Sequence, residues 1–201
     1  MAPPTEGTYK LNTDASVKIN SGRGKVSGIF RYHRGDWVIG YTKVFTHVDV
    51  YQAELLAILE GLKIAITHHL TSLEINSDSA TVISMITSDY PRYSNTVAEC
   101  RYLMRELGTP TLRYTCREQN SVADVMERST SVDNAPFDQL HILRVTLLYV
   151  AQAMVADKHG VAFPRRIAIV NIVNNVNTSP TLSNSVGGST DTLQTSCINA
   201  T

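Results

Sequence analysis

The chain has 201 residues, of which 43% are hydrophobic and 18% are charged. This length fits one domain with an appendage, or at most two domains, and the hydrophobic fraction excludes wholesale disorder because it supplies a sizeable core. Eighteen basic residues balance eighteen acidic ones, so net charge does not indicate a nucleic-acid or membrane partner.

Cysteine usage and the apolar segments predict a nuclear or cytoplasmic protein that is not secreted. Three scattered cysteines, Cys100, Cys116 and Cys197, form no C-x-x-C pair, which argues against a disulfide framework and a disulfide-linked partner. The first residues lack the charged and apolar regions of a secretory signal. The longest apolar stretch, near Leu147, is shorter than the ~20 residues that span a bilayer. We expect a monomer without membrane association.

The amino-terminal part predicts three antiparallel strands. Residues 8–13 alternate between apolar and polar side chains, which indicates a short strand that ends at Asp14. A turn precedes a second strand over 25–32, and the Arg-Gly-Asp turn at 34–36 leads into a third strand over 37–45.

The apolar period then changes from two to 3.6, which predicts a helix over 52–68. The elements expected after it are a buried strand at 73–75, a helix capped by Ser77 or Asp78, a helix over 95–107 closed at Gly108, a strand over 111–116 and a helix over 121–129. This order predicts an α/β domain with a mixed five-stranded sheet, three strands antiparallel and the later ones parallel, flanked by helices.

The character of the chain changes after residue 132. Residues 138–158 predict an amphipathic helix, with Asp138 near its start and Gly160 after its end. From Asn171 onward Asn, Thr and Ser dominate, so we expect disorder there. The predicted organisation is an amino-terminal extension (1–7), an α/β domain (8–132), a helical appendage (133–160) and a largely disordered polar tail (161–201).

Four acidic residues occupy unusual places. Asp14 and Asp78 each follow a predicted strand, Glu54 lies early in the long helix, and Asp124 begins the last short helix. A lone acid is usually an exposed residue or a helix cap, so the argument depends on the set. If the two strands are parallel neighbours, their carboxylates lie side by side at one edge of the sheet.

Carboxylates that converge at one edge repel each other unless cations lie between them. A set of oxygen ligands selects hard cations such as Mg²⁺ or Mn²⁺ over zinc or copper. Two such ions ~3.5–4 Å apart assist in-line displacement at phosphorus. The four acids therefore predict metal-dependent phosphodiester chemistry.

Five motifs, spread over roughly residues 8–130, resemble the ribonuclease H-like domain of plants, which occurs in short proteins and in non-LTR retrotransposon polyproteins. They are Asn12-Thr-Asp14-Ala-Ser16, the hairpin His33-Arg-Gly-Asp-Trp37, Ala53-Glu54-Leu55-x-Ala57-x-x-x-Gly61-Leu62, Asn76-Ser-Asp78-Ser79 and Arg117-Glu118-x-Asn120-x-x-Ala123-Asp124. Their order and spacing match that family.

This resemblance implies a ribonuclease H-like fold and hydrolysis of the RNA strand of RNA–DNA hybrids. It implies two Mg²⁺ ions per site, with Mn²⁺ as a substitute. The residues implied to act as catalytic metal ligands are Asp14, Glu54, Asp78 and Asp124. Those implied to contact nucleic acid are Ser16, Arg117 and Asn120.

Several positions depart from the family pattern. Tyr114 stands where many relatives have a histidine, Asn76 stands where relatives often have Glu, and Glu127-Arg128 replaces the usual Ala-Lys. No Lys/Trp-rich protrusion helix is present in the sequence. These departures predict low turnover.

Two alternatives to the enzyme therefore stay open. One is a retroelement-derived module of the same fold that binds nucleic acid with little or no catalysis. The other is an interaction protein that works through the predicted helix at 138–158.

Overall fold

Three long strands with alternating buried residues build the first half of the sheet. They are β1 (Tyr9–Lys18), β2 (Arg23–Arg31) and β3 (Trp37–Phe45), each antiparallel to the next. The computed structural model describes residues 6–88, 90–129 and 137–158, which all belong to one unit of the chain, Met1–Pro164.

The second half of the sheet is parallel. Strand β4 (Leu73–Ser77) pairs with β1, and β5 (Thr111–Tyr114) pairs with β4. Their connections contain the helices α1 (Val50–Thr67), α2 (Ala80–Thr87) and α3 (Ser94–Glu106). The expected mixed sheet is therefore confirmed.

Four further elements follow β5: the 3₁₀ turn η1 (Arg117–Asn120), α4 (Ser121–Ser129), β6 (His141–Leu143) and α5 (Leu148–Lys158). Strand β6 pairs antiparallel with β3, so the sheet has the order β5-β4-β1-β2-β3-β6. It thus has one strand more than the five expected, because the segment after α4 returns to the open edge of β3.

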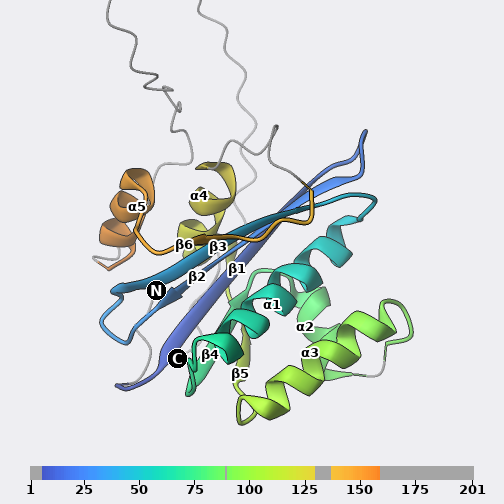
Figure 1. Ribbon diagram of the computed structural model, residues 1–201, viewed down its shortest axis with the longest axis horizontal. Coiled ribbons are helices and arrows are strands. Elements are labelled where there is room, and N and C mark those ends of the chain that lie inside the picture. The colour runs from blue at the N-terminus through green and yellow to red at the C-terminus, as the bar shows by residue number, and fades with distance from the viewer. Residues whose placement is uncertain (1–5, 89, 130–136, 159–201) are drawn as a thin grey trace, which may run out of the picture. The chain divides into compact units, whose positions relative to one another are not determined.

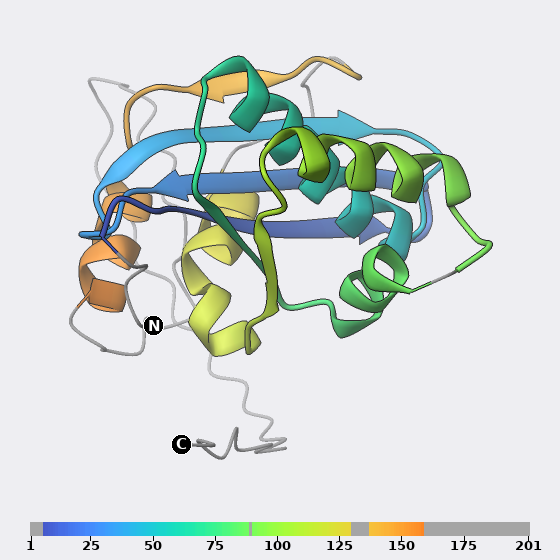
Figure 2. The same cartoon turned by 90° about the horizontal axis from the view of Figure 1, so that it is seen from below.

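Helices cover both faces of the sheet. Helices α1, α2 and α3 lie on one face and α4 and α5 on the other (Figure 1), and α1 and α3 extend along the strands in the second view (Figure 2). Leu11, Tyr41, Ile58 and Leu62 are fully buried in the core on the first face. Burying a side chain of this size stabilises the fold by about 1.5–3 kcal/mol.

A glycine allows the close approach of α1 to β1. A Cβ atom at Gly61 would lie 2.5 Å from Cδ2 of Leu11 and 2.8 Å from the hydroxyl oxygen of Tyr41. That hydroxyl donates a 2.5 Å hydrogen bond to the carbonyl oxygen of Ala57. The contact fixes the position of α1, and therefore of the residues near its first turns, against the sheet.

The cap of α2 differs from the expectation. Ser79, not Ser77 or Asp78, is the N-cap, and its side chain accepts a 3.4 Å hydrogen bond from the backbone amide of Val82. The Ser77 side chain instead accepts from the backbone amide of Ser79 at 3.1 Å. The carboxylate of Asp78 is consequently not used as the helix cap.

Asp14 also differs from its expected place at a strand end. Strand β1 continues to Lys18 because β2 pairs with it over that whole length. The parallel pairing with β4, however, ends at Asn12 and Asn76. Asp14 therefore lies inside β1 but beyond the part of it that β4 covers.

The helix expected over 138–158 is wrong in its first half. Helix α5 begins only at Leu148, and residues 141–143 form β6. The backbone amide of Asp138 donates a 2.9 Å hydrogen bond to the carbonyl oxygen of Val44, and its carboxylate lies 3.0 Å from Nζ of Lys43. These contacts bring the segment to β3, whose unpaired backbone groups favour a strand there.

The predicted tail (161–201) lies outside the described residues, as does nearly all of the amino-terminal extension (1–7). Within the part of the chain that the structure describes, none of the helices combines the length and apolar character needed to cross a bilayer.

Candidate metal centre

Three carboxylates meet at the edge where the parallel strands end. Asp14 comes from β1, Asp78 directly follows β4, and Glu54 comes from the early part of α1. One oxygen from each lies within 4.8 Å of the other two. The pairing of Asn12 with Asn76 explains this geometry, because the two aspartates lie two residues further along neighbouring parallel strands.

Burial makes this cluster electrostatically unfavourable without a cation. Asp14 and Glu54 are only 6% and 7% exposed. Desolvation is the main cause that raises the pKa of Asp14 well above its ordinary value, followed by the charges of Asp78, Asp124 and Glu127. Desolvation likewise raises the pKa of Glu54 well above its ordinary value, followed by the charges of Asp14 and Asp78.

One oxygen of the cluster lacks a hydrogen-bond partner. Oε2 of Glu54 is buried and has none, although a buried polar atom normally has one. A divalent cation between the three carboxylates would satisfy this oxygen and offset the repulsion. The residues therefore fit a hard cation, for which carboxylate oxygens are the preferred ligands.

Asp124 lies near this cluster but is not one of the three that converge. It lies in the first turn of α4, and its Oδ1 is 2.8 Å from Nη2 of Arg128 and 4.0 Å from Nη2 of Arg117. Of the four carboxylates predicted to meet, three lie close together. The fourth, Asp124, forms an ion pair with Arg128. A cation between Asp14 and Asp124 would compete with these arginines.

The ion pair of Asp124 with Arg128 is the feature that the sequence interpretation missed. The two residues are four apart on one helix, a spacing at which an acid and a base meet on the same face. That spacing could have predicted the pair.

The three residues implied to contact nucleic acid lie in different surroundings. Arg117 has a side chain that is 62% exposed beside Asp124. Ser16 donates a hydrogen bond to Oε1 of Glu127. Asn120 is only 1% exposed, which leaves no surface for a nucleic-acid contact. Of the three, Arg117 and Ser16 are exposed and Asn120 is buried.

Tyr114 lies at the same edge of the sheet as the three carboxylates. It pairs in register with Ser77, the residue before Asp78, and it is 56% exposed. The position where the family resemblance implies a histidine thus holds an exposed phenol ring.

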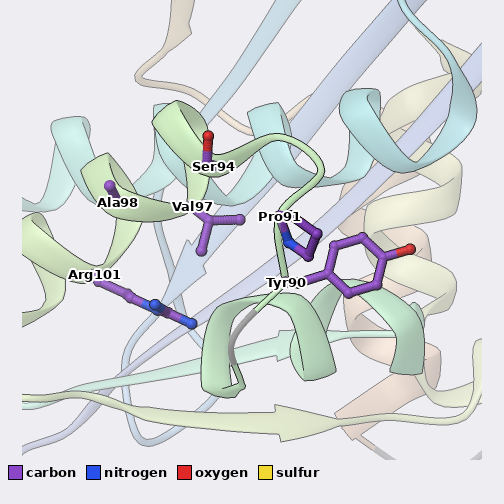
Figure 3. A pocket seen from close by; sticks show the side chains of 6 residues that line it. All are labelled: Tyr90, Pro91, Ser94, Val97, Ala98 and Arg101. Atoms are coloured by element: carbon purple, nitrogen blue, oxygen red, sulfur yellow. The ribbon is translucent and has the colours of Figure 1, made fainter.

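A hollow of about 330 Å³ lies beside α3, lined by Tyr90, Pro91, Ser94, Val97, Ala98 and Arg101 (Figure 3). Arg101 donates to the carbonyl oxygens of Ile86 at 2.7 Å, Met85 at 3.3 Å and Ser88. Its guanidinium joins the end of α2 to α3, and none of the clustered carboxylates lines this hollow.

The model of the family described as reverse transcriptase-like matches residues 12–129, which is more than half of the chain and includes all four acids. The chain belongs to the reverse transcriptase-like family. An Arabidopsis thaliana protein named "Putative ribonuclease H protein" is 27% identical over 172 residues, which cover 83% of this chain and 27% of that protein. This reverse transcriptase-like chain thus spans about a quarter of that relative, and the resemblance to plant ribonuclease H-like domains is confirmed.

Solved structures confirm the ribonuclease H-like fold. RNase H1 from the halophilic archaeon Halobacterium salinarum superposes with a TM-score of 0.58 at 20% identity, covering 64% of this chain and all of that one. The RNase H domain of a Mycobacterium tuberculosis protein gives 0.55 at 15% identity, covering 61% and 91%. LC11-RNase H1 in complex with an RNA/DNA hybrid gives 0.55 at 15% identity, covering 61% and 96%.

Proposed function

We propose that this domain is a metal-dependent endoribonuclease that hydrolyses the RNA strand of RNA–DNA hybrids. The observation that carries the proposal is the cluster of Asp14, Glu54 and Asp78, in which a buried Glu54 oxygen lacks a partner. The relatives support it, since one is named a ribonuclease H protein and another was solved with an RNA/DNA hybrid.

In this proposal Asp14, Glu54 and Asp78 hold the divalent ion. Mg²⁺, or Mn²⁺ in its place, supplies a Lewis acid that activates water and offsets charge on the phosphodiester. The buried position of Asp14 and Glu54 keeps two ligand oxygens away from competing water. Arg117, exposed beside the cluster, binds a phosphate oxygen of the substrate and helps to orient the scissile bond.

A second ion, as a two-metal mechanism requires, would bind between Asp14 and Asp124. Arg128 lies 2.8 Å from Oδ1 of Asp124 and would compete with such an ion for this carboxylate. Turnover would then depend on whether Asp124 exchanges its arginine partner for a cation. We propose that this exchange makes the enzyme slow and its rate dependent on metal concentration.

Substrate recognition in this proposal depends on the RNA strand. The 2′-hydroxyl groups in the minor groove of the hybrid distinguish RNA from DNA. The net charge of the chain is zero, so few phosphates are neutralised, binding is weak and it weakens further with salt.

The test is cleavage of a labelled RNA–DNA hybrid in Mg²⁺ and then in Mn²⁺. The Asp78→Asn variant should lose cleavage by at least about a hundredfold because it removes a ligand charge while keeping the shape of the side chain. Asp36→Asn changes an acid whose side chain is 63% exposed and is the matched control. Equal activity of Asp78→Asn and the parent chain would refute the assignment.

A second candidate is a retroelement-derived module that binds nucleic acid without efficient catalysis. The ion pair of Arg128 with Asp124 and the exposed Tyr114 favour it, because each alters a position tied to turnover in the resemblance. It predicts binding of the hybrid without cleavage in either metal, measured on protein shown to be folded.

A further inference from the structure

A buried ion pair joins α5 to the sheet. Nη1 of Arg31, on β2, lies 2.6 Å from Oδ2 of Asp157, on α5, and the two side chains are 5% and 8% exposed. Helix α5 lies beyond residue 129, where the family match ends. A buried pair of charges is costly unless its geometry and further hydrogen bonds are good, so its other contacts matter.

The ion pair continues as a chain of buried hydrogen bonds that leads to the metal centre. Nη2 of Arg31 donates to Oδ1 of Asn12 at 2.8 Å, and Nδ2 of Asn12 donates to Oδ1 of Asn120 at 3.1 Å. Nδ2 of Asn120 donates to the carbonyl oxygen of Thr13 at 2.7 Å. The Asn120 side chain also lies close enough to Asp78 to oppose the rise in the pKa of that carboxyl.

Arg31 sets the direction of this chain because a guanidinium can only donate. The oxygen of Asn12 must face Arg31, so its amino group faces Asn120. The oxygen of Asn120 accepts from Asn12, so the amino group of Asn120 is the group that donates to the carbonyl oxygen of Thr13, the residue before Asp14. Arg31, Asn12 and Asn120 are each at most 4% exposed, so water does not compete for these bonds.

We infer that Asp157 is a positioning residue of the metal centre. By fixing Arg31 it fixes both amide groups, and Asn120 thereby holds Asp78 and the backbone before Asp14 in the arrangement that binds a cation. A helix outside the family match thus becomes part of the machinery for the ribonuclease activity, and this consequence for catalysis rests on the proposed function.

The apolar packing of α5 makes it possible to test the positioning role of Asp157 without detaching the helix from the sheet. Val150 and Ala153 of α5 are fully buried against Ile29, Val122 and Met126. These contacts do not involve Asp157, so they keep α5 docked when the Asp157 carboxylate is removed. Removing this carboxylate then takes away the first group of the series of buried hydrogen bonds, while the helix stays in place.

The test compares Asp157→Ala with Lys158→Ala in the full chain. Lys158 is the next residue on α5 and pairs with Asp36 at 3.8 Å, where both side chains are more than half exposed. Asp157→Ala should shift the NMR signals of the Asn12 and Asn120 side-chain amides and weaken Mn²⁺ binding, measured by calorimetry, by about fivefold. Lys158→Ala should change neither.

A second variant tests the same role in case Asp157→Ala, which leaves the buried charge of Arg31 unpaired, fails to fold. The double variant Arg31→Met with Asp157→Leu removes both buried charges and keeps their volume, an exchange that often leaves stability unchanged. It should free the Asn12 amide and shift the same signals. Variants whose Asn120 signals and Mn²⁺ affinity match the parent chain would overturn the inference.

The two readouts also separate this inference from the proposed function. If the parent chain cleaves no hybrid while Asp157→Ala still shifts Asn120 and weakens Mn²⁺ binding, the nuclease proposal fails and the positioning role holds. If the parent chain cleaves hybrid and Asp157→Ala leaves Asn120, Mn²⁺ binding and rate unchanged, the nuclease proposal holds and the positioning role fails.

Discussion

At the scale of single residues, the charges around the metal centre are unevenly balanced. Asp14 and Glu54 are buried, and Asp78, which is half-buried, lies within 4.8 Å of both, whereas Asp124 has Arg128 at 2.8 Å. A cation therefore offsets repulsion at the first three but must displace an existing partner at the fourth. This difference leads to two predictions, one on metal affinity and one on pH.

Arg128→Ala should strengthen binding of the divalent ion that involves Asp124. Removal of the guanidinium leaves the carboxylate without its i,i+4 partner, and the negative charge there favours a cation. We expect hybrid cleavage to reach half its maximal rate at a Mg²⁺ concentration several-fold lower than for the parent chain. Arg105→Ala, in the last turn of α3, is the control, and an unchanged Mg²⁺ dependence of Arg128→Ala would contradict the prediction.

The metal-free protein should lose stability as pH rises. The folded-state pKa values of Asp14 and Glu54 are raised above 3.8 and 4.5, so the folded state binds protons more tightly than the unfolded state. Their contribution to stability is present below those ordinary values and is lost as pH rises through the folded-state values. Chemical denaturation in a chelator should show the free energy of unfolding falling over this range.

Two controls accompany that pH series. Asp14→Asn should flatten the slope, because it removes one titrating group and one repulsive charge. Mg²⁺ should restore stability at neutral pH, because it binds only the folded cluster. A free energy of unfolding that rises from mildly acidic to neutral pH in the chelator would contradict the assigned direction.

At the scale of elements, the site depends on how closely α1 packs on β1. Glu54 reaches the aspartates because α1 lies close enough for Gly61 to touch Leu11. The length and register of the two parallel strands matter equally, since pairing ends at Asn12 and Asn76. Helix and strand positions, and not the acids alone, therefore create the cluster.

Gly61→Ala should destabilise the protein by about 1–3 kcal/mol, because the added Cβ overlaps a core side chain. Thermal unfolding followed by circular dichroism measures the loss. Lys63→Ala is the control on the same helix, since that side chain is 43% exposed and forms an exposed pair with Glu99, worth at most about 1 kcal/mol. Equal stability of Gly61→Ala and the parent chain would show that α1 can move away from β1 at little cost.

At the scale of the whole molecule, the described fold extends beyond the family match. Strand β6 pairs with β3 at the edge of the sheet. Helix α5 packs beside α4 in one hydrophobic cluster on the same face of the sheet. The boundary expected at residue 132 separates these elements from the sheet to which they belong. The folded unit is therefore longer than the motifs indicate.

A chain shortened to residues 1–132 should be less stable than the full chain by about 3–6 kcal/mol, because it loses the apolar burial that Val150 and Ala153 share with Ile29 and Met126. Denaturant unfolding of the two chains measures this difference. A chain ending at residue 164, the end of the unit that holds all described elements, is the control and should match the full chain. A shortened chain of full stability would place β6 and α5 outside the folded unit.

The sequence alone determined the order of the nine helices and strands from β1 to α4, up to changes in their ends, because the apolar periods of two and 3.6 and the turn residues are local features. Residues 121–129 match α4 at both ends. The motifs around Asp14, Glu54, Asp78 and Asp124 were sufficient to show the resemblance to the family. Of the four acids that the sequence predicted to meet, three do so and Asp124 does not.

Only the tertiary structure decided which of the acids converge. Asp124 lies outside the group of three carboxylates that come together, and Asn120 lies in the interior and not at a surface. The apolar pattern over 138–158 fits a helix locally, but its first half became β6 because β3 offered unpaired backbone groups. The ion pair of Asp157 with Arg31 joins segments more than a hundred residues apart, and no local period or motif encodes such a contact.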